Sequence, residues 1–495
     1  MQKLFWIVLC LTCCGTVRWA AADVVTDWDP IANNTVNTDT ANSATHQPGP
    51  GWASRNLAMT MAAVCDAIDS ATTTRPYSTY AYTGQTYANA SKTAAAAYAA
   101  HDVLASLYGS SNPTTNQQTT LDNDLNVSLT GIAGQALADG KTLGQAVALA
   151  VINKRASDGS GASNSYTTTN TLGHYQLQPG QTAWGPVWGN VTPFVLNATQ
   201  MTGNSTLIAN KINTLVPGAT SLTSNTFLSS PAFATAFNQV MSLGAATGST
   251  RTLDQTKAGY YWAYDVGGLG PPPILYNEIL QNIANSKGNT VQQNARLFAL
   301  ANMAMADASI VSWKEKFLQD FFRPITAAQE GASLAAINSG ITSVNTSWTP
   351  LGAPSVIIPN ASSPPGTNAP FTPPFPAFTS GHASFGGALF ETLRDFYGTD
   401  NIGFTFTSDN LPNDPRTFTT LSQAETENAY SRVYLGIHWS FDADIGSASG
   451  DLIGDNVFSS MIVPTPEPST FVLAGLGLLG LIGLARRRKA APNQS

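Results

Sequence analysis

Apolar residues recur at every third or fourth position along much of this chain, which is the spacing of one face of an α-helix. Alternating apolar and polar positions, which are typical of strands, are sparse. The Ala-rich stretch after Ser91 is a strong helix former, and Ser91 is its expected N-cap. Helices are predicted over residues 56–68, 91–107, 142–155, 290–322, 380–397 and 422–435. We therefore expect a mainly α-helical body.

Prolines and one capping motif place several of the helix ends. Pro271-Pro272-Pro273 is expected to stop a helix, and Ser422-Gln-Ala-Glu425 forms a capping box that begins the last helix. Nine prolines fall between residues 350 and 376, so this segment cannot be helical. We expect it to cross the surface as an extended arm that ends at the sequence 375–382.

Charge and composition exclude two classes of protein. The chain has 495 residues and a formal net charge of −7. Only 11% of its residues are charged and 43% are hydrophobic, which excludes a disordered, highly charged chain. The acidic balance argues against nucleic acid as a partner, because that function needs a basic surface. The length allows a large core or two packed subdomains.

The N-terminus has the pattern of an export signal. Lys3 precedes the apolar run 4–11, and Ala20-Ala21-Ala22 provides a cleavage site of small residues. Residues 1–22 are therefore predicted to be a secretory signal peptide that uses the Sec route. Three of the four cysteines lie in this segment, so Cys65 alone remains in the body and no intrachain disulfide can form there.

The C-terminus contains a Pro-Glu-Pro sequence within residues 464–468, then the apolar run 471–485, then the basic cluster 486–489. The apolar run is short for a spanning helix, which needs about 20 residues. A plain membrane anchor is the alternative interpretation. The arrangement over residues 463–489 resembles the PEP-CTERM sorting signal. That resemblance implies a Gram-negative exporter, cleavage by an exosortase, transient membrane contact, and a final place in the periplasm, on the outer surface or in the extracellular matrix.

Three short segments contain candidate anion-binding residues, and the first contains two cations. Lys316 and Arg323 are seven residues apart, about two turns of one helix, so both are expected to point the same way. Pro324 is expected to end that helix just after the arginine. Two cations on one face would repel each other unless an anion lay between them. Taken alone, the segment is better explained as an amphipathic helix with solvated basic residues.

The second segment is Ser380-Gly381-His382, at a predicted junction between a loop and a helix. A helix N-terminus presents backbone N–H groups to an anion. His382 adds a proton donor near neutral pH. Taken alone, the tripeptide is explained as a turn with a surface histidine.

The third segment runs from Arg432 to Asp442. His438 and Asp442 are four residues apart, one helical turn, so the carboxylate can accept the Nδ1 proton and leave Nε2 as a nucleophile or ligand. Arg432 offers two parallel donors to an oxyanion. Taken alone, the segment is explained as a helical salt bridge with a hydrogen-bonded histidine.

Together the three segments read Lys-x6-Arg-Pro, Ser-Gly-His and Ser-Arg-x5-His-x3-Asp. This order resembles the tripartite signature of the superfamily of type 2 phosphatidic acid phosphatases and vanadium haloperoxidases. Residues 251–277, Trp313 and the sequence 373–377 also resemble fungal-type vanadium chloroperoxidases, and the similarity extends to about residue 453. Thr379 departs from the pattern, because proline commonly precedes Ser-Gly-His.

The resemblance implies a vanadate cofactor with His438 as its ligand. His382 would be the acid–base residue, and Asp265 would brace both Arg432 and His382. The vanadate oxygens would be bound by Lys316, Arg323, Ser380, Gly381 and Arg432.

The predicted function is that of an exported vanadium haloperoxidase, which oxidises halide with hydrogen peroxide to hypohalous acid. Trp313 and Phe375 resemble the aromatic wall of the halide pocket in that family, and Phe375 favours a chloroperoxidase-like pocket. Fixed cations around an oxyanion would draw electron density from the peroxide, and the metal would act as a Lewis acid without changing its oxidation state.

An acid phosphatase is the alternative, because vanadate and phosphate share charge and shape. His438, oriented by Asp442, would attack the phosphate ester to form a phosphohistidine, and His382 would protonate the leaving alkoxide. A third possibility is a surface or matrix protein with a vestigial site, and the intact cations and histidines argue against it. The resemblance implies an all-α fold of two packed helical bundles, with an N-terminal helical part at 23–230 and a catalytic domain at 231–462.

Overall fold

The computed structural model describes residues 23–41, 49–110, 116–163, 165–265, 270–354, 356–358 and 371–461. The predicted signal peptide, the predicted sorting signal and the middle of the proline-rich segment lie outside these residues. Regular structure in the described chain is almost entirely helical, with one small antiparallel pair of strands, β1 (Phe404–Phe406) and β2 (Arg416–Phe418). The predicted all-α fold is confirmed.

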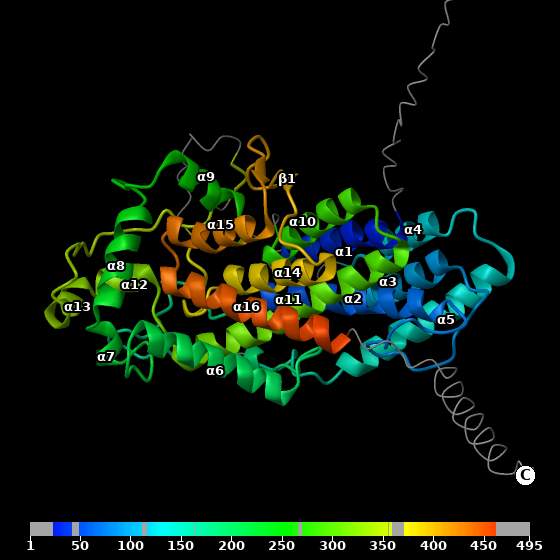
Figure 1. The fold of residues 1–495 in the computed structure, drawn as a ribbon, viewed down its shortest axis with the longest axis horizontal. Coiled ribbons are helices and arrows are strands. Elements are labelled where there is room, and N and C mark those ends of the chain that lie inside the picture. Colours follow the sequence, from blue (N-terminus) through cyan, green and yellow to red (C-terminus); the bar gives the residue numbers. More distant parts are fainter. Residues whose placement is uncertain are drawn as a thin grey trace, which may run out of the picture.

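Sixteen α-helices and one short 3-10 helix follow one another along the described residues (Figure 1). The α-helices are α1 (Val24–Thr40), α2 (Pro50–Ser70), α3 (Lys92–Tyr108), α4 (Gln118–Ser128), α5 (Gly134–Arg155), α6 (Ala198–Leu215), α7 (Asn225–Leu228), α8 (Pro231–Leu243), α9 (Leu253–Tyr261), α10 (Pro272–Lys287), α11 (Val291–Gln319), α12 (Pro324–Gln329), α13 (Gly331–Ile337), α14 (Gly381–Tyr397), α15 (Leu421–Tyr434) and α16 (Ser440–Met461), and the 3-10 helix is η1 (Trp188–Asn190). None of these helices is long and apolar enough to cross a membrane.

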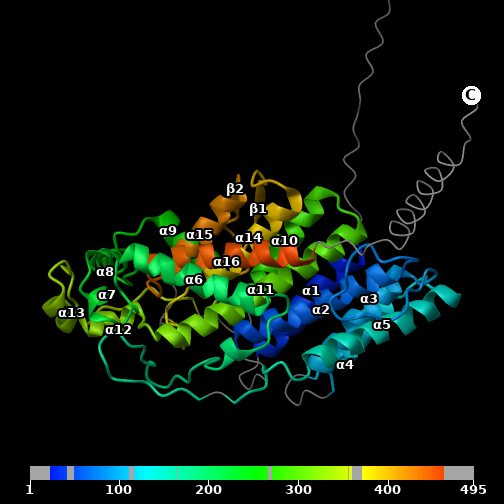
Figure 2. The same ribbon diagram turned by 60° about the horizontal axis from the view of Figure 1, so that its bottom comes forward.

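The long helix α11 lies at the centre of an elongated molecule (Figure 1). It is buried on nearly all faces from Asn294 to Lys316 and packs against α2, α14 and α16. The group α2, α3 and α5 lies toward one end of the molecule, and α12 and α13 lie at the other (Figure 1). Figure 2 shows α6 running beside α16, where Asn204 Nδ2 donates to the Ser449 carbonyl at 3.0 Å.

One hydrophobic core joins the N-terminal helices to the helices of the predicted catalytic region. The same cluster contains Trp28 and Leu57 from α1 and α2, and Phe298 and Phe385 from α11 and α14. Burial of this apolar surface is the main source of the stability of the fold. The division at residues 230 and 231 stays a prediction.

Two glycines bring α14 and α16 into close contact. A Cβ atom on Gly387 would lie 2.5 Å from the Ser447 carbonyl oxygen, and one on Gly450 would lie 2.4 Å from that of Ser384. The close approach places the start of α14 against the start of α16. Ser380 N–H accordingly donates to the Asp442 carbonyl at 3.2 Å. The packing of these two helices therefore joins two of the three segments identified in the sequence.

The predicted N-cap of the helix over 91–107 is confirmed, because Ser91 Oγ accepts the N–H of Ala94 at 3.2 Å at the start of α3. We expect Ser91→Ala to lower the free energy of unfolding by about 1 kcal/mol, because one helix N–H loses its acceptor. Ser91→Gly should cost only a few tenths of a kcal/mol. Urea denaturation of the three proteins measures both changes. Equal stability of Ser91→Ala and the wild type would contradict the prediction.

The helix predicted over 290–322 begins as expected after Thr290 but ends at Gln319, so the prediction that Lys316 and Arg323 share one helix face is wrong. Asp320 adopts a left-handed conformation, with φ 48° and ψ 36°. Phe322 N–H then donates to the Gly173 carbonyl at 3.0 Å, so the chain pairs with a distant segment instead of continuing the helix. Arg323 becomes the N-cap of α12, and Pro324 begins that helix.

Three smaller predictions are also corrected. The last predicted helix is capped by Thr420, whose Oγ1 accepts the Gln423 N–H at 3.1 Å, and not by Ser422. The triplet 271–273 begins α10 instead of stopping a helix, because proline is well suited to the first helical turn. Helix α16 begins at Ser440, so His438 precedes it. The described part of the proline-rich segment is non-helical, as predicted.

Candidate active site

The second and third segments line one small buried pocket, and Arg323 of the first segment contacts it through His438. It is formed where α14 begins, where α15 ends and just before α16, beside the middle of α11. The pocket is lined by Pro50, Asp265, Pro272, Trp313, Pro373, Phe375, Gly381, His382, Phe385, Arg432 and His438. Seven of these residues are predicted site residues, and most of the others are apolar.

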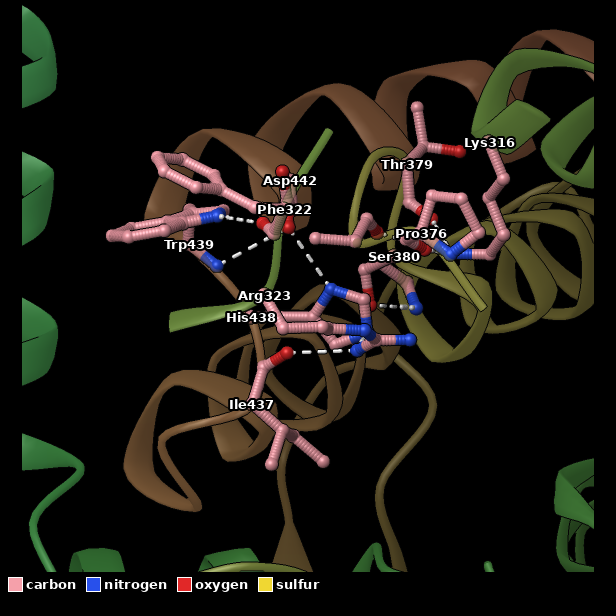
Figure 3. A network of polar contacts seen from close by, with 12 residues as sticks. Lys316, Phe322, Arg323, Pro376, Thr379, Ser380, Ile437, His438, Trp439 and Asp442 are labelled. Carbon is pink, nitrogen blue, oxygen red and sulfur yellow. Dashed lines mark hydrogen bonds and ion pairs between the residues drawn. The ribbon is translucent and has the colours of Figure 1, made fainter. Parts of the chain in front are cut away.

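His438 is held in one tautomer from both sides (Figure 3). Its Nδ1 lies 3.0 Å from Asp442 Oδ2, which also accepts the Trp439 N–H at 3.2 Å. Its Nε2 lies 3.0 Å from Arg323 Nη1, which can only donate. The proton therefore resides on Nδ1 and the Nε2 lone pair faces the arginine. Burial, together with Arg323, holds the pKa of His438 well below its usual range, and burial raises the pKa of Asp442 to about 7.

Two buried guanidinium groups carry N–H groups that have no partner in the described part of the chain. Arg323 donates from Nε to the Phe375 carbonyl at 2.8 Å and from Nη1 to the Ile437 carbonyl at 2.7 Å, but its Nη2 is unpaired. Arg432 forms an ion pair through Nη2 with Asp265, and its Nε and Nη1 are unpaired. Burial lowers the pKa of Arg323 to about 10, so it stays charged at neutral pH. Buried unpaired donors on two cations are well suited to bind an anion.

His382 is the second residue of α14, and its Nε2 lies 2.8 Å from the Ala263 carbonyl oxygen. Nε2 must therefore donate, which leaves Nδ1 as the basic atom of the ring. The expectation that Asp265 braces both Arg432 and His382 is half right, because the carboxylate pairs with Arg432 and a backbone carbonyl holds the histidine. Burial and Arg432 hold the pKa of His382 well below its usual range.

Ser380 and Gly381 form the N-terminus of α14, as predicted. Ser380 is the N-cap, and its Oγ accepts the Ala383 N–H at 3.4 Å. Gly381 is the first helical residue, so its N–H is among those that no helix carbonyl can accept. This end of the helix adds a backbone donor and the positive end of the helix dipole to the pocket.

Lys316 bonds to backbone carbonyls in this structure, and its role in binding the anion stays a prediction. All three of its donors bond to carbonyls of the loop before α14: those of Pro376 at 3.1 Å, of Ala377 at 3.0 Å, and of Thr379 (Figure 3). In this structure Lys316 therefore holds the loop that carries Ser380. Burial, together with Arg323, holds the pKa of Lys316 well below its usual range.

Aromatic rings close the other side of the pocket. The ring centroids of Trp313 and Phe375 lie 4.9 Å apart, and Lys316 Nζ lies 5.0 Å from the Phe375 centroid. Phe385 adds a third ring, which the sequence interpretation missed. It lies one helical turn after His382 on the predicted helix, and this spacing was the signal that could have found it.

The other missed residues act through His382 or line the pocket. Tyr276 Oη and Asn428 Nδ2 both lie 2.9 Å from the His382 carbonyl oxygen. Asn428 lies one helical turn before Arg432, so the spacing could have indicated it. Pro50 comes from the distant start of α2, and no local signal points to it.

Comparisons with known proteins agree with this geometry. Residues 296–463 match a protein family described as the VCPO second helical-bundle domain, and residues 464–489 match the PEP-CTERM protein-sorting motif. The vanadium chloroperoxidase of Curvularia inaequalis is 36% identical over 247 residues, which are 40% of this chain and 38% of that protein. The chain thus matches well under half the length of this curated relative. The resemblances identified in the sequence are confirmed.

Solved structures show the same fold. A bacterial vanadium-dependent iodoperoxidase superposes with a TM-score of 0.66 at 21% identity and covers 90% of this chain and 99% of its own. The apo form of a bacterial vanadium-dependent chloroperoxidase gives a TM-score of 0.55 at 16% identity, covering 85% of this chain and 96% of its own. The holo form of a bacterial vanadium-dependent chloroperoxidase gives a TM-score of 0.55 at 14% identity, covering 90% of this chain and 99% of its own.

Proposed function

We propose that this protein, whose residues 296–463 carry the VCPO second helical-bundle domain, is an exported vanadium-dependent haloperoxidase. It would oxidise halide with hydrogen peroxide to hypohalous acid. One observation carries the proposal: two buried arginines with unpaired N–H groups meet an unprotonated histidine nitrogen. Arg432 lines the same pocket as His438, and Arg323 donates to His438 Nε2.

The donor set fits vanadate. A vanadate ion has several charged oxygens, and two guanidinium groups and the Gly381 N–H offer donors to them. His438 Nε2 offers the nitrogen ligand, and Ser380 offers a hydroxyl. Lys316 would contribute its charge from behind the loop that it holds. Bound vanadate would supply a Lewis acid that activates hydrogen peroxide toward halide.

The residues of the chain would move protons and exclude water. His382 is neutral at neutral pH and basic at Nδ1, so it can accept a proton from hydrogen peroxide there. Asp442 keeps the proton of His438 on Nδ1. Trp313, Phe375 and Phe385 would shield the halide from water, while the nearby cations attract it.

An acid phosphatase remains the second candidate, because the His438–Asp442 pair also suits attack on a phosphate ester. The pocket wall argues for the first candidate. Its three aromatic rings and three prolines leave a small, apolar opening that suits a halide ion better than a bulky ester.

The sorting motif at residues 464–489 indicates export in a Gram-negative bacterium. We propose that residues 1–22 direct the chain through the Sec route and that an exosortase removes the C-terminal motif after transient membrane contact. The mature enzyme would then act in the periplasm, on the outer surface or in the extracellular matrix.

One experiment separates the two activities. Metal-free protein is given vanadate and peroxide, and halogenation of a cyclic diketone is followed with chloride and with bromide. Hydrolysis of p-nitrophenyl phosphate is measured on the same sample. We expect halogenation that depends on vanadate, and inhibition by vanadate of any hydrolysis. Robust hydrolysis without halogenation would assign the protein to the phosphatases instead.

A further inference from the structure

Residues 262–265 connect two parts of the site that lie on different helices. The Ala263 carbonyl accepts the His382 Nε2–H at 2.8 Å, and Asp265 forms the ion pair with Arg432. Only one residue separates these two contacts along the chain. The conformation at that residue therefore sets the position of His382 relative to Arg432.

The intervening residue is Tyr264, whose backbone is strained. It is fully buried and has φ 38°, a left-handed conformation that side-chain-bearing residues rarely adopt. Such a conformation persists only where surrounding contacts enforce it. Tyr264 therefore needs an anchor that is strong enough to hold it.

The Tyr264 hydroxyl provides that anchor. It donates to Glu278 Oε2 on α10 at 2.9 Å and accepts the backbone N–H of Asp409 at 2.9 Å. Burial, with a smaller contribution from Asp409, raises the pKa of Glu278 to about 8. A neutral carboxyl group at this position can accept the hydrogen bond from the Tyr264 hydroxyl without placing a buried charge beside it.

We propose that Tyr264 and Glu278 are positioning residues for the anion site. Their hydrogen bond holds the strained backbone so that the Ala263 carbonyl faces His382 and the Asp265 carboxylate faces Arg432. Neither residue lines the pocket. The identification of the anion as vanadate rests on the proposed function, whereas the positioning role applies to any oxyanion bound there.

The test is Tyr264→Phe in the full-length protein, with orthophosphate and orthovanadate as separate probes in isothermal titration calorimetry. The variant keeps the buried ring and loses only the anchoring hydroxyl. We expect the Kd for both anions to rise about tenfold, the cost of one buried hydrogen bond expressed as affinity. The melting temperature of each variant is recorded alongside.

Tyr261→Phe is the matched control. Tyr261 is equally buried, but its hydroxyl donates to the Phe406 carbonyl at 3.2 Å and not to Glu278. The Tyr261→Phe variant should lose about as much stability as Tyr264→Phe and keep the wild-type Kd for both anions. Glu278→Gln retains an acceptor for Tyr264 and should also keep the wild-type Kd, whereas Glu278→Leu should behave like Tyr264→Phe.

Unchanged affinity in Tyr264→Phe, or equal weakening in both tyrosine variants, would overturn the proposal. A wild-type protein that binds neither anion would overturn it as well. If the wild type binds both anions but oxidises no halide, the proposed function fails while the Kd values still decide the positioning role.

Discussion

His438→Ala is expected to lower vanadate-dependent halide oxidation at least about 1,000-fold in kcat/KM, because it removes the nitrogen proposed to ligate the oxyanion and leaves only electrostatic binding. His438 is buried and its Nε2 faces Arg323. A solvent-exposed side chain therefore cannot take over the position of its ring. Residual binding through Arg323, Arg432 and the Gly381 N–H should still be measurable by calorimetry as a weaker Kd for vanadate.

The control for this variant is His101→Gln, because His101 is also largely buried but bonds to Asp102 and Asp122 in the N-terminal helices. Halogenation is measured at saturating vanadate, so that a loss of affinity is separated from a loss of turnover. We expect full activity in the control. If His438→Ala retained more than a tenth of the wild-type activity, both enzymatic interpretations of this site would be wrong.

The helices and several of their caps could be predicted from local sequence, since the signals are local. Ser91 and Ser380 each precede an apolar-periodic run, and both are N-caps in the structure. The end of α11 could not be predicted in this way. The chain leaves the helix at Asp320 to pair with residues 173–175, a contact between segments almost 150 residues apart, and Phe321 and Phe322 continue the helical pattern past the real end.

The site was predictable where a side chain carries the chemistry and not where the backbone does. Arg432, His438 and His382 form a recognisable ordered pattern, and the structure brings them to one pocket. The partner of His382 is the carbonyl of Ala263, and an alanine gives no sequence signal for such a role. Lys316 shows the converse, because its charge was evident while its bonds to three loop carbonyls depend on the tertiary fold.

Asp442→Asn is expected to weaken vanadate binding and halide oxidation by about 100-fold, the upper range for loss of a group that orients a metal-bound histidine. The carboxylate accepts two N–H groups through Oδ2, from the His438 ring and from the Trp439 backbone. An asparagine that keeps its oxygen there retains both bonds. It lacks the negative charge that Asp442 carries above its pKa of about 7, and this charge makes Nε2 a better donor of its lone pair.

If the asparagine amide took the opposite orientation, it would not support vanadate binding by His438 either. Its NH₂ group would then donate to Nδ1 and move the ring proton to Nε2, where it would face the donor Nη1 of Arg323. Asp444→Asn is the matched control, since Asp444 is an exposed residue of the same helix and accepts the Tyr430 hydroxyl at 3.0 Å. We expect the control to bind vanadate as the wild type does. Equal affinity in both variants, by calorimetry, would mean that Asp442 does not set the tautomer of His438, and the ligand role of Nε2 would then need another source of orientation within the pocket.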